Sequence, residues 1–291
     1  MERIIENDHL IVKIKSKGAE LFSINGKKTQ QEYLWNADPA FWAKTSPILF
    51  PIVGTLKDST YYYNDKAYSL PGRHGFARDE EFTVEDQAKD TITFLLSSTP
   101  ESLAKYPFAF TLRVQYELKE QFLFTTYTID NTGEEEMYFS VGGHPAFKVP
   151  LADGLKYDDY FLEFNKRENV ERWPISKDGL IETEPQPFLQ NTNRLPLKHD
   201  LFYNEAIVLK DLQSDIISLK SARDAHGFDF HFKGFPYLGI WAQKDADFVC
   251  IEPWYGISDS VTHDQQLITK EGIEQLEPGD SWSEGWKVKF Y

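Results

Sequence analysis

The sequence is poor in cysteine and contains no cysteine pair. Its 291 residues include a single cysteine, Cys250, so an intrachain disulfide and a CxxC metal motif are both excluded. A chain without disulfides suits a reducing compartment, and we therefore expect a cytoplasmic protein. Cys250 lies within an apolar run, which indicates a core residue with little nucleophilic role.

Long apolar segments are also missing. Lys, Arg, Asp or Glu interrupts every apolar run well before the roughly 20 residues that a membrane-spanning helix needs. The first residues of the chain are charged and lack the apolar centre of a signal peptide. We therefore expect no membrane partner and no secretion.

Positive charge is scarce, with 31 Lys and Arg against 46 Asp and Glu and a net charge of −15. Such a chain repels the phosphates of nucleic acids and anionic lipids, and no local basic cluster offsets this field. A GxSxG elbow, a P-loop, a helix-opening GxGxxG and an HExxH motif are absent as well. The sequence therefore gives no sign of a nucleic-acid partner or of the chemistries that these motifs carry.

Aromatic residues are abundant, with 22 Phe, 15 Tyr and 7 Trp, and they favour the half-buried surfaces of β-sheets. Asn25-Gly26 follows an alternating run and predicts a tight hairpin turn with positive φ at both residues. Helical periodicity is confined to residues 101–106 and 263–271. Short alternating or β-branched runs predict strands at residues 10–15, 20–24, 91–96, 111–118, 122–129, 160–164, 206–209, 216–219, 228–232, 238–242, 248–251 and 287–291.

These elements indicate a mainly β protein with a large antiparallel β-sandwich or distorted barrel, because antiparallel sheets cover one another without crossover helices. No internal repeat or low-complexity segment divides the chain. The Pro- and Asn-rich piece at residues 184–196 is predicted to be a long loop, with a linker between two domains as the alternative. We expect a single domain over residues 1–291, whose edge strands could pair into a homodimer.

Three segments break the alternating pattern, and each places glycine beside an ionisable residue. In the first, residues 71–80, two glycines let the backbone bend around His74, and Arg73 and Arg78 flank this histidine. The pattern favours a ligand-binding loop. The alternative is that both arginines pair with the acidic residues that follow, on a solvated loop.

The second segment, residues 139–147, runs from an apolar strand into Gly142-Gly143 and then into His144. The proline that follows restricts His144 to extended conformations, so its side chain has a defined direction. Two glycines leave space around it, which favours a functional histidine. A satisfied core or surface histidine is the alternative.

The third segment, residues 247–259, contains Glu252 at the end of a strand that otherwise looks buried. Partial burial raises the pKa of a carboxyl group and makes the carboxylate a better proton acceptor near neutrality. Glu252 is therefore a candidate general base. The alternative is a carboxylate that points outward or pairs with an arginine.

Histidine and glutamate could also bind zinc. His74 and His144 with Glu252 form one possible set, and His226 with His231 forms another. The second pair has the wrong spacing for adjacent turns of a helix, and in an extended chain one side chain would face inward and the other outward. We therefore expect no metal, with zinc as the alternative.

Five motifs follow one another along nearly the whole chain, and in this order and spacing they resemble the aldose 1-epimerase family. The resemblance is to the galactose mutarotase-like proteins and especially to the bacterial LacX-type branch. The motifs are Ser-Pro-Ile-Leu-Phe-Pro-Ile-Val-Gly at 46–54, His-Gly-Phe-Ala-Arg at 74–78, Gly-Gly-His-Pro-Ala-Phe at 142–147, Ile-Glu-Pro-Trp at 251–254 and Leu-Glu-Pro-Gly-Asp at 276–280.

The resemblance implies a large β-sandwich with an open cleft, in which a sugar binds against aromatic side chains such as Trp254. It implies that Glu252 removes the proton from the anomeric hydroxyl and that His144 protonates the ring oxygen. His74 would bind and polarise the sugar. Rotation in the open-chain aldehyde and reclosure give the other anomer, so a paired acid and base suffice and no cofactor is required.

Two positions depart from the family pattern. An arginine expected soon after Gly54 is missing, and Arg78 is the candidate to supply that charge. An aspartate that holds sugar hydroxyls has no clean counterpart, and Asn204, Glu205 and Asp200 are the nearest candidates for substrate binding. Specificity for galactose is therefore not predicted.

Three other functions remain open at this point. A hexose-6-phosphate 1-epimerase would need a cationic pocket, which Arg73, Arg78 and Lys57 could furnish. A non-catalytic carbohydrate-binding protein of the same fold would not need the matched acid and base. A glycoside hydrolase would need a second carboxylate, for which Asp259 is the candidate.

Overall fold

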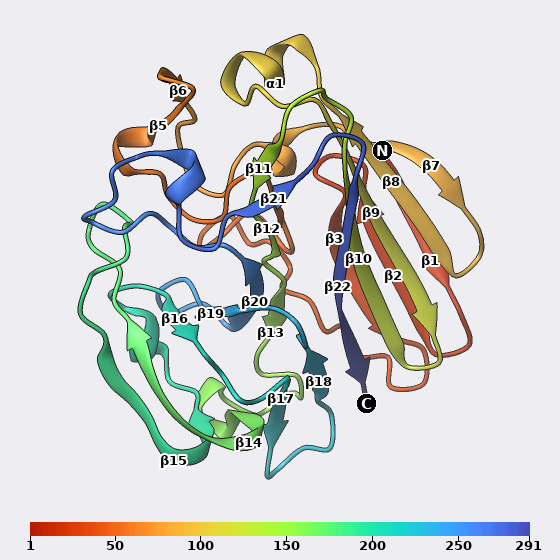
Figure 1. Cartoon of the computed structure of the whole chain (residues 1–291). Coiled ribbons are helices and arrows are strands. Elements are labelled where there is room, and N and C mark those ends of the chain that lie inside the picture. Colours follow the sequence, from red (N-terminus) through yellow and green to blue (C-terminus); the bar gives the residue numbers. More distant parts are fainter.

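One large antiparallel sheet dominates the computed structural model, which describes residues 1–291 (Figure 1). Its main path runs β4 (Ile48–Leu49), β12 (Val141–Gly143), β20 (Phe248–Tyr255), β19 (Tyr237–Trp241), β16 (Ile207–Lys210), β14 (Tyr160–Trp173), β17 (Ile216–Ser221), β18 (Phe228–His231), β22 (Ser281–Phe290), β10 (Phe122–Asn131), β9 (Phe110–Lys119), β8 (Thr91–Ser97) and β7 (Thr83–Gln87). Off this path, β13 (Ala146–Lys148) pairs with β20, and β15 (Gln186–Pro196) pairs with β14.

Three smaller sheets accompany the large one. They are formed by β1 (Glu2–Glu6), β2 (Leu10–Lys15) and β3 (Glu20–Gly26), by β5 (Thr60–Tyr63) and β6 (Lys66–Ser69), and by β11 (Met137–Phe139) and β21 (Glu274–Leu276). The helical elements are α1 (Pro100–Lys105) and the short 3-10 turns η1 (Lys57–Ser59), η2 (Ala77–Asp79), η3 (Tyr157–Asp159), η4 (His199–Phe202) and η5 (Leu267–Thr269). None of these helices has the length and apolar character to cross a membrane.

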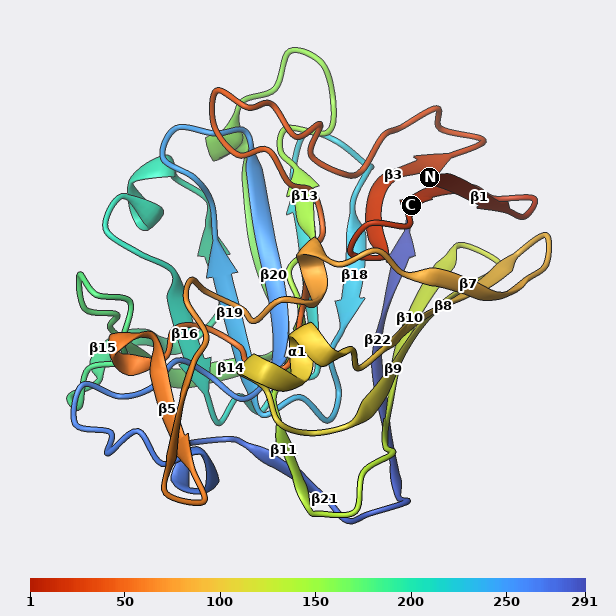
Figure 2. The same cartoon turned by 90° about the horizontal axis from the view of Figure 1, so that it is seen from above.

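Two sheets face each other at one end of the molecule and form the sandwich. Side chains of β9 and β10 alternate strictly between buried and less buried positions, as expected for strands with one face in a core. The sheet β1–β3 covers that buried face, and both figures place it beside β8, β9 and β10 (Figures 1 and 2). Across the layers, the hydroxyl of Tyr116 on β9 donates to the backbone oxygen of Ala19 at 2.8 Å. The expected mainly β sandwich is therefore confirmed.

The strand β20 is central to the other half of the molecule (Figure 2). It is buried along almost its whole length, and it is an interior strand, since β19 pairs with one edge while β12 and β13 share the other. Its sequence explains this position, since a continuous run of apolar residues from Phe248 to Ile251 has no polar face to expose. The run ends at Glu252, so the sheet carries an acidic residue into a buried environment.

Every predicted strand overlaps an observed one, and the predicted helix at 101–106 corresponds to α1. The predicted hairpin turn at Asn25-Gly26 is wrong. Both residues continue β3 in extended conformation, where Gly26 pairs with Leu10, and the turn follows at residues 27–31. Backbone pairing to β2 therefore extends further than the turn-forming composition suggests.

The predicted helix at 263–271 is also wrong, because only the short turn η5 forms there. The Asp264 carboxylate accepts bonds from the Gln266 backbone and the Thr269 hydroxyl, each at 3.0 Å. Such local bonds from side chain to backbone compete with a helical ladder. The predicted long loop at 184–196 is instead largely the strand β15, which pairs only with β14 and tolerates its prolines because it is an edge strand.

The contact between Tyr116 and Ala19 generates a stability prediction. Tyr116→Phe removes the only donor across the layers at this point and leaves a buried carbonyl oxygen unpaired, which costs about 1–3 kcal/mol. We expect the free energy of unfolding in urea to fall by that amount, while Tyr62→Phe, at an exposed hydroxyl, leaves it nearly unchanged. Equal stabilities for the two variants would show that the hydrogen bond does not join the layers.

Candidate active site

Glu252 lies on β20 with its side chain 1% exposed. Burial raises the pKa of its carboxyl group well above the usual range, and the neighbouring Trp254 indole opposes this shift only in part. No positively charged side chain forms an ion pair with the carboxylate other than His144, whose charge depends on protonation. The Glu252 carboxyl group therefore favours its protonated form in the substrate-free site.

The strands β12 and β13 place His144 directly opposite Glu252. Gly142 pairs with Trp254 and Ala146 pairs with Cys250, so the same register continues across the break between the two strands. As a result, the His144 Nε2 atom lies 3.2 Å from Glu252 Oε2.

Close packing explains why two glycines precede His144. A Cβ atom on Gly142 would lie 2.7 Å from the Trp254 ring, and one on Gly143 would lie 2.8 Å from the Trp286 indole nitrogen. Any larger residue would push β12 away from these rings. The close packing of β12 therefore sets the position of His144.

His74 approaches the same point from the loop between β6 and η2. Its backbone has a φ of +68°, which is uncommon for a residue other than glycine, and two bonds to Gly54 hold it. The Gly54 N–H donates to His74 Nδ1 at 3.0 Å, and the His74 N–H donates to the Gly54 oxygen at 2.8 Å. Because Nδ1 accepts, the ring proton of a neutral His74 is on Nε2. The His74 and His144 rings meet edge to face with centroids 5.5 Å apart.

Burial and positive neighbours keep both histidines neutral. Burial lowers the pKa of His144, and the Arg78 charge acts in the same direction. Burial also lowers the pKa of His74 far below its usual value, and His144, Arg78 and Arg73 add to that effect. With Glu252 protonated and His144 neutral, the Glu252 and His144 pair holds one acidic proton that can pass between the carboxyl group and the imidazole.

An open cavity of about 540 Å³ surrounds these three side chains. Trp42, Trp241 and Trp254 contribute broad aromatic surfaces to its lining. The Trp42 ring stacks on His144 with centroids 5.0 Å apart, and Trp241 meets the same histidine edge to face at 5.6 Å. The lining thus combines a few convergent polar groups with apolar faces, as in typical small-molecule sites.

Cations outnumber acids in this lining. Arg73, Arg78, Lys177 and Lys244 line the cavity, against two carboxyl groups. The acids are Glu252 and Glu205, and burial raises the pKa of both. In a chain with a net charge of −15, the cavity therefore has the opposite sign from the molecule as a whole.

The structure brings the residues predicted from the sequence into one place. All of them line the cavity: Glu252, His144, His74, Arg73, Arg78, Asn204 and Trp254. Arg78 also lies 3.7 Å from Asp79, so one of the solvated-loop pairings expected as an alternative does form. Arg73 has no ion-pair partner among the acidic residues that follow it, and its guanidinium lies against Gly179.

Three minor candidates lie outside the cavity. The Lys57 ammonium group donates to the backbone oxygen of His263 at 3.1 Å and cannot join a phosphate pocket with Arg73 and Arg78. Asp200 does not line the cavity. Asp259 is buried in an ion pair with Lys270, which removes the proposed second carboxylate of a glycoside hydrolase. The sequence alone could not show that Lys57 and Asp259 bind other parts of the chain.

Several lining residues escaped the sequence analysis. Trp42 lies in an irregular segment without periodicity, Trp241 lies at the end of a predicted strand, and Lys177 and Lys244 lie in turns. No local pattern marks which aromatic or basic residues face a cavity. Only the glycine-bearing segments gave such a signal.

Potential metal ligands come together at one point, where atoms of His144, Cys250 and Glu252 lie within 4.8 Å of one another. Burial raises the pKa of the Cys250 thiol, which disfavours the thiolate that metals prefer. The observed group contains His144 and Glu252 of the first suggested zinc set, with Cys250 in place of His74, whereas His226 and His231 do not belong to it.

Comparisons with known proteins agree with this geometry. Residues 3–272 match the family model for aldose 1-epimerase. The chromosomal and plasmid LacX proteins of Lactococcus lactis subsp. lactis are each 36% identical over 295 aligned residues, which cover 98% of this chain and 97% of theirs.

Solved structures show the same relationship. A galactose mutarotase related enzyme from Lactobacillus acidophilus superposes with a TM-score of 0.94 at 34% identity, covering 100% of this chain and 97% of that one. A galactose mutarotase-like protein from Lactobacillus casei ATCC 334 gives a TM-score of 0.94 at 32% identity, with both chains covered completely. The chain therefore belongs to the aldose 1-epimerase family of carbohydrate isomerases.

Proposed function

We propose that the protein interconverts the α and β anomers of a hexose by acid-base catalysis between Glu252 and His144. The observation that carries this proposal is the 3.2 Å contact between the two side chains within a cavity lined by tryptophans. Tryptophan faces suit the apolar faces of sugar rings. Neither a metal nor a cofactor is needed, because the bond between C1 and the ring oxygen opens and closes with proton transfers to and from two sugar oxygens alone.

The pair begins the reaction by redistributing its single proton. Transfer from Glu252 to His144 across their contact gives a carboxylate and an imidazolium, which a bound sugar stabilises with its hydroxyl groups. The Glu252 carboxylate then takes the proton from the anomeric hydroxyl, the bond between C1 and the ring oxygen breaks, and His144 protonates that oxygen. The product of this half-reaction is the open-chain aldehyde.

The second half restores the enzyme. Rotation about the bond between C1 and C2 turns the other face of the aldehyde toward the ring oxygen. That oxygen attacks C1 and returns its proton to His144, while the former carbonyl oxygen takes the proton from Glu252. The His144 imidazolium then returns its proton to the Glu252 carboxylate, so all protons balance and the pair is back in its starting state.

Other lining residues hold the sugar in this proposal. The Nε2–H group of His74 donates to a sugar oxygen and polarises it, since its Nδ1 atom is already bound to the Gly54 N–H. Arg78 supplies positive charge near the developing negative oxygen. Asn204 and Glu205, which also line the cavity, bind sugar hydroxyls, and Trp254 packs beside the reacting centre.

A phosphorylated hexose is the second candidate substrate. The excess of lysine and arginine in the cavity lining supports an anionic ligand, because a neutral sugar does not require four cations. The acid-base chemistry is the same for both substrates.

The catalytic assignment predicts complementary losses of activity. Glu252→Gln and His144→Asn should each slow anomer interconversion by about 10²–10⁴-fold, because each removes one partner of the proton exchange. NMR saturation transfer measures the rate on glucose, galactose and their 6-phosphates. Glu168→Gln is the matched control, since this buried carboxylate binds the Ser214 backbone outside the cavity. Full activity in either catalytic variant would rule out the assignment.

If the lysines of the cavity bind a phosphate group, their removal should reduce the preference of the enzyme for phosphorylated over free hexose. In the double variant Lys177→Met and Lys244→Met, the ratio of kcat/KM for hexose-6-phosphate to kcat/KM for free hexose should fall about tenfold, the value of one charged hydrogen bond. The exposed Lys28→Met serves as the control. An unchanged ratio would leave the free hexose as the substrate.

A further inference from the structure

A buried ion pair lies behind the cavity wall. The side chains of Asp259 and Lys270 are 0% and 1% exposed, and the Lys270 Nζ atom lies 2.7 Å from Asp259 Oδ1. The same ammonium group donates to the backbone oxygen of Ile257 at 2.7 Å. Neither charged group lines the cavity, so neither can touch a sugar there. A buried ion pair is weak evidence for stability, which raises the question of its role.

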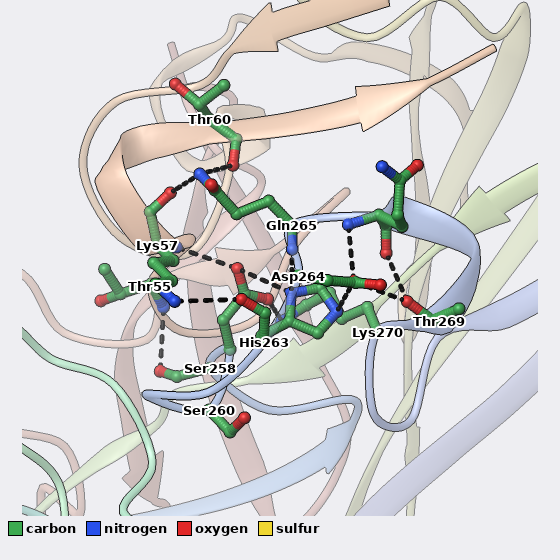
Figure 3. Close-up of polar contacts among 12 residues, drawn as sticks. Thr55, Lys57, Thr60, Ser258, Ser260, His263, Asp264, Gln265, Thr269 and Lys270 are labelled. Carbon is green, nitrogen blue, oxygen red and sulfur yellow. Dashed lines mark hydrogen bonds and ion pairs between the residues drawn. The ribbon is translucent and has the colours of Figure 1, made fainter. Parts of the chain in front are cut away.

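Asp259 and its neighbour dock the segment at residues 54–57. The Lys57 N–H donates to Asp259 Oδ2, the Asp259 N–H donates to the Thr55 oxygen, and the Thr55 N–H donates to the Ser258 hydroxyl, each at 2.9 Å. Figure 3 shows Thr55, Lys57, Ser258 and Lys270 gathered around this point. One oxygen of the Asp259 carboxylate thus binds Lys270, and the other fixes the docked segment.

The far side of the same segment holds His74. Both bonds that fix His74, one to its ring and one to its backbone, come from Gly54, the residue before Thr55. A movement of residues 54–57 would therefore displace the His74 ring. It would also free Nδ1 and allow the proton to move to that nitrogen. The neighbours of His74 are held by the same part of the chain, because Arg73 bridges to Thr55 and Gly75 bridges to Phe50.

A second wall of the cavity depends on Asp259 as well. The Ile181 N–H donates to the backbone oxygen of Asp259 at 2.8 Å. This bond anchors the loop that carries Lys177 and Gly179 along the cavity. A Cβ atom on Gly179 would lie 2.9 Å from the Arg73 guanidinium, so the loop packs closely on that arginine. Asp259 therefore ties two walls together.

We propose that Asp259 and Lys270 are positioning residues, which hold residues 54–57 so that His74 presents its Nε2–H to the substrate. The proposal rests on the function proposed above for its consequence in catalysis. Its structural part, the orientation and tautomer of His74, stands without a substrate. Asp259 and Lys270 act only through their neighbours and transfer no proton to the sugar.

The test compares two double variants in which the pair is removed together, so that no single buried charge is left behind. Asp259→Ala with Lys270→Met takes away the acceptor of the Lys57 N–H, whereas Asp259→Asn with Lys270→Met keeps an oxygen at that position. Histidine labelled with ¹⁵N reports the tautomer of His74 by NMR, after assignment with His74→Gln. Saturation transfer gives kcat and KM.

We expect the alanine double variant to lose the pure Nε2–H tautomer of His74 and to lose about 10–100-fold in kcat/KM, as for a misplaced binding group. The asparagine double variant should keep most of the Nε2–H tautomer of His74 and most of kcat/KM. Glu168→Ala controls for loss of stability, because Glu168 is a buried carboxylate that accepts backbone N–H groups of Gln213 and Ser214 outside the cavity. It should leave the His74 signals unchanged.

Three outcomes are decisive. If the alanine double variant folds and keeps the wild-type His74 signals and kcat/KM, the proposal is overturned. If it does not fold, Ser258→Ala, which removes the acceptor of the Thr55 N–H, must shift the same signals or the proposal fails. If the wild type accelerates no sugar, the proposed function fails, and the His74 tautomer in the sugar-free variants still decides the positioning role.

Discussion

The contact between the buried side chains of Glu252 and His144 is the interaction on which the site depends. In water at neutral pH, a carboxyl group is ionised and an imidazole is mostly neutral. Such a pair holds no proton that could pass from one group to the other. Burial between β12, β13 and β19 raises the pKa of the Glu252 carboxyl and lowers the pKa of the His144 imidazole. These opposite shifts leave one proton between two adjacent groups, which is the state that anomer exchange requires.

The surroundings of the pair follow from the register of the sheet. A continuous register through β12 and β13 puts His144 opposite Glu252, and the glycines before His144 allow β12 to pack against tryptophan rings. The remaining histidine, His74, belongs to no strand and owes its place to hydrogen bonds from residues 54–57. Backbone pairing thus sets the positions of Glu252 and His144, while His74 lies in a loop bonded to Gly54 next to the segment that Asp259 binds.

Local patterns predicted what is local. Alternation and β-branched runs located the strands, and the three glycine-bearing segments contained Glu252, His144 and His74. The failures have two causes. Local bonds to the Asp264 side chain compete with the predicted helix, and pairing of β15 with β14 turns a presumed loop into a strand. The tryptophans and lysines of the cavity come from segments with no shared pattern, so only the folded chain shows that they face one ligand site.

The central claim is that burial keeps Glu252 protonated in the sugar-free enzyme, and its ionisation can be measured directly. Glutamate labelled with ¹³C at the carboxyl carbon reports each side chain by NMR, and Glu252→Gln identifies the signal of interest. A carboxyl signal that titrates well above the ordinary glutamate range is the predicted result, because burial raises the pKa of this group. A Glu252 that titrates near the ordinary glutamate value of 4.5 would contradict this account, because the pair would then hold no proton to exchange at neutral pH.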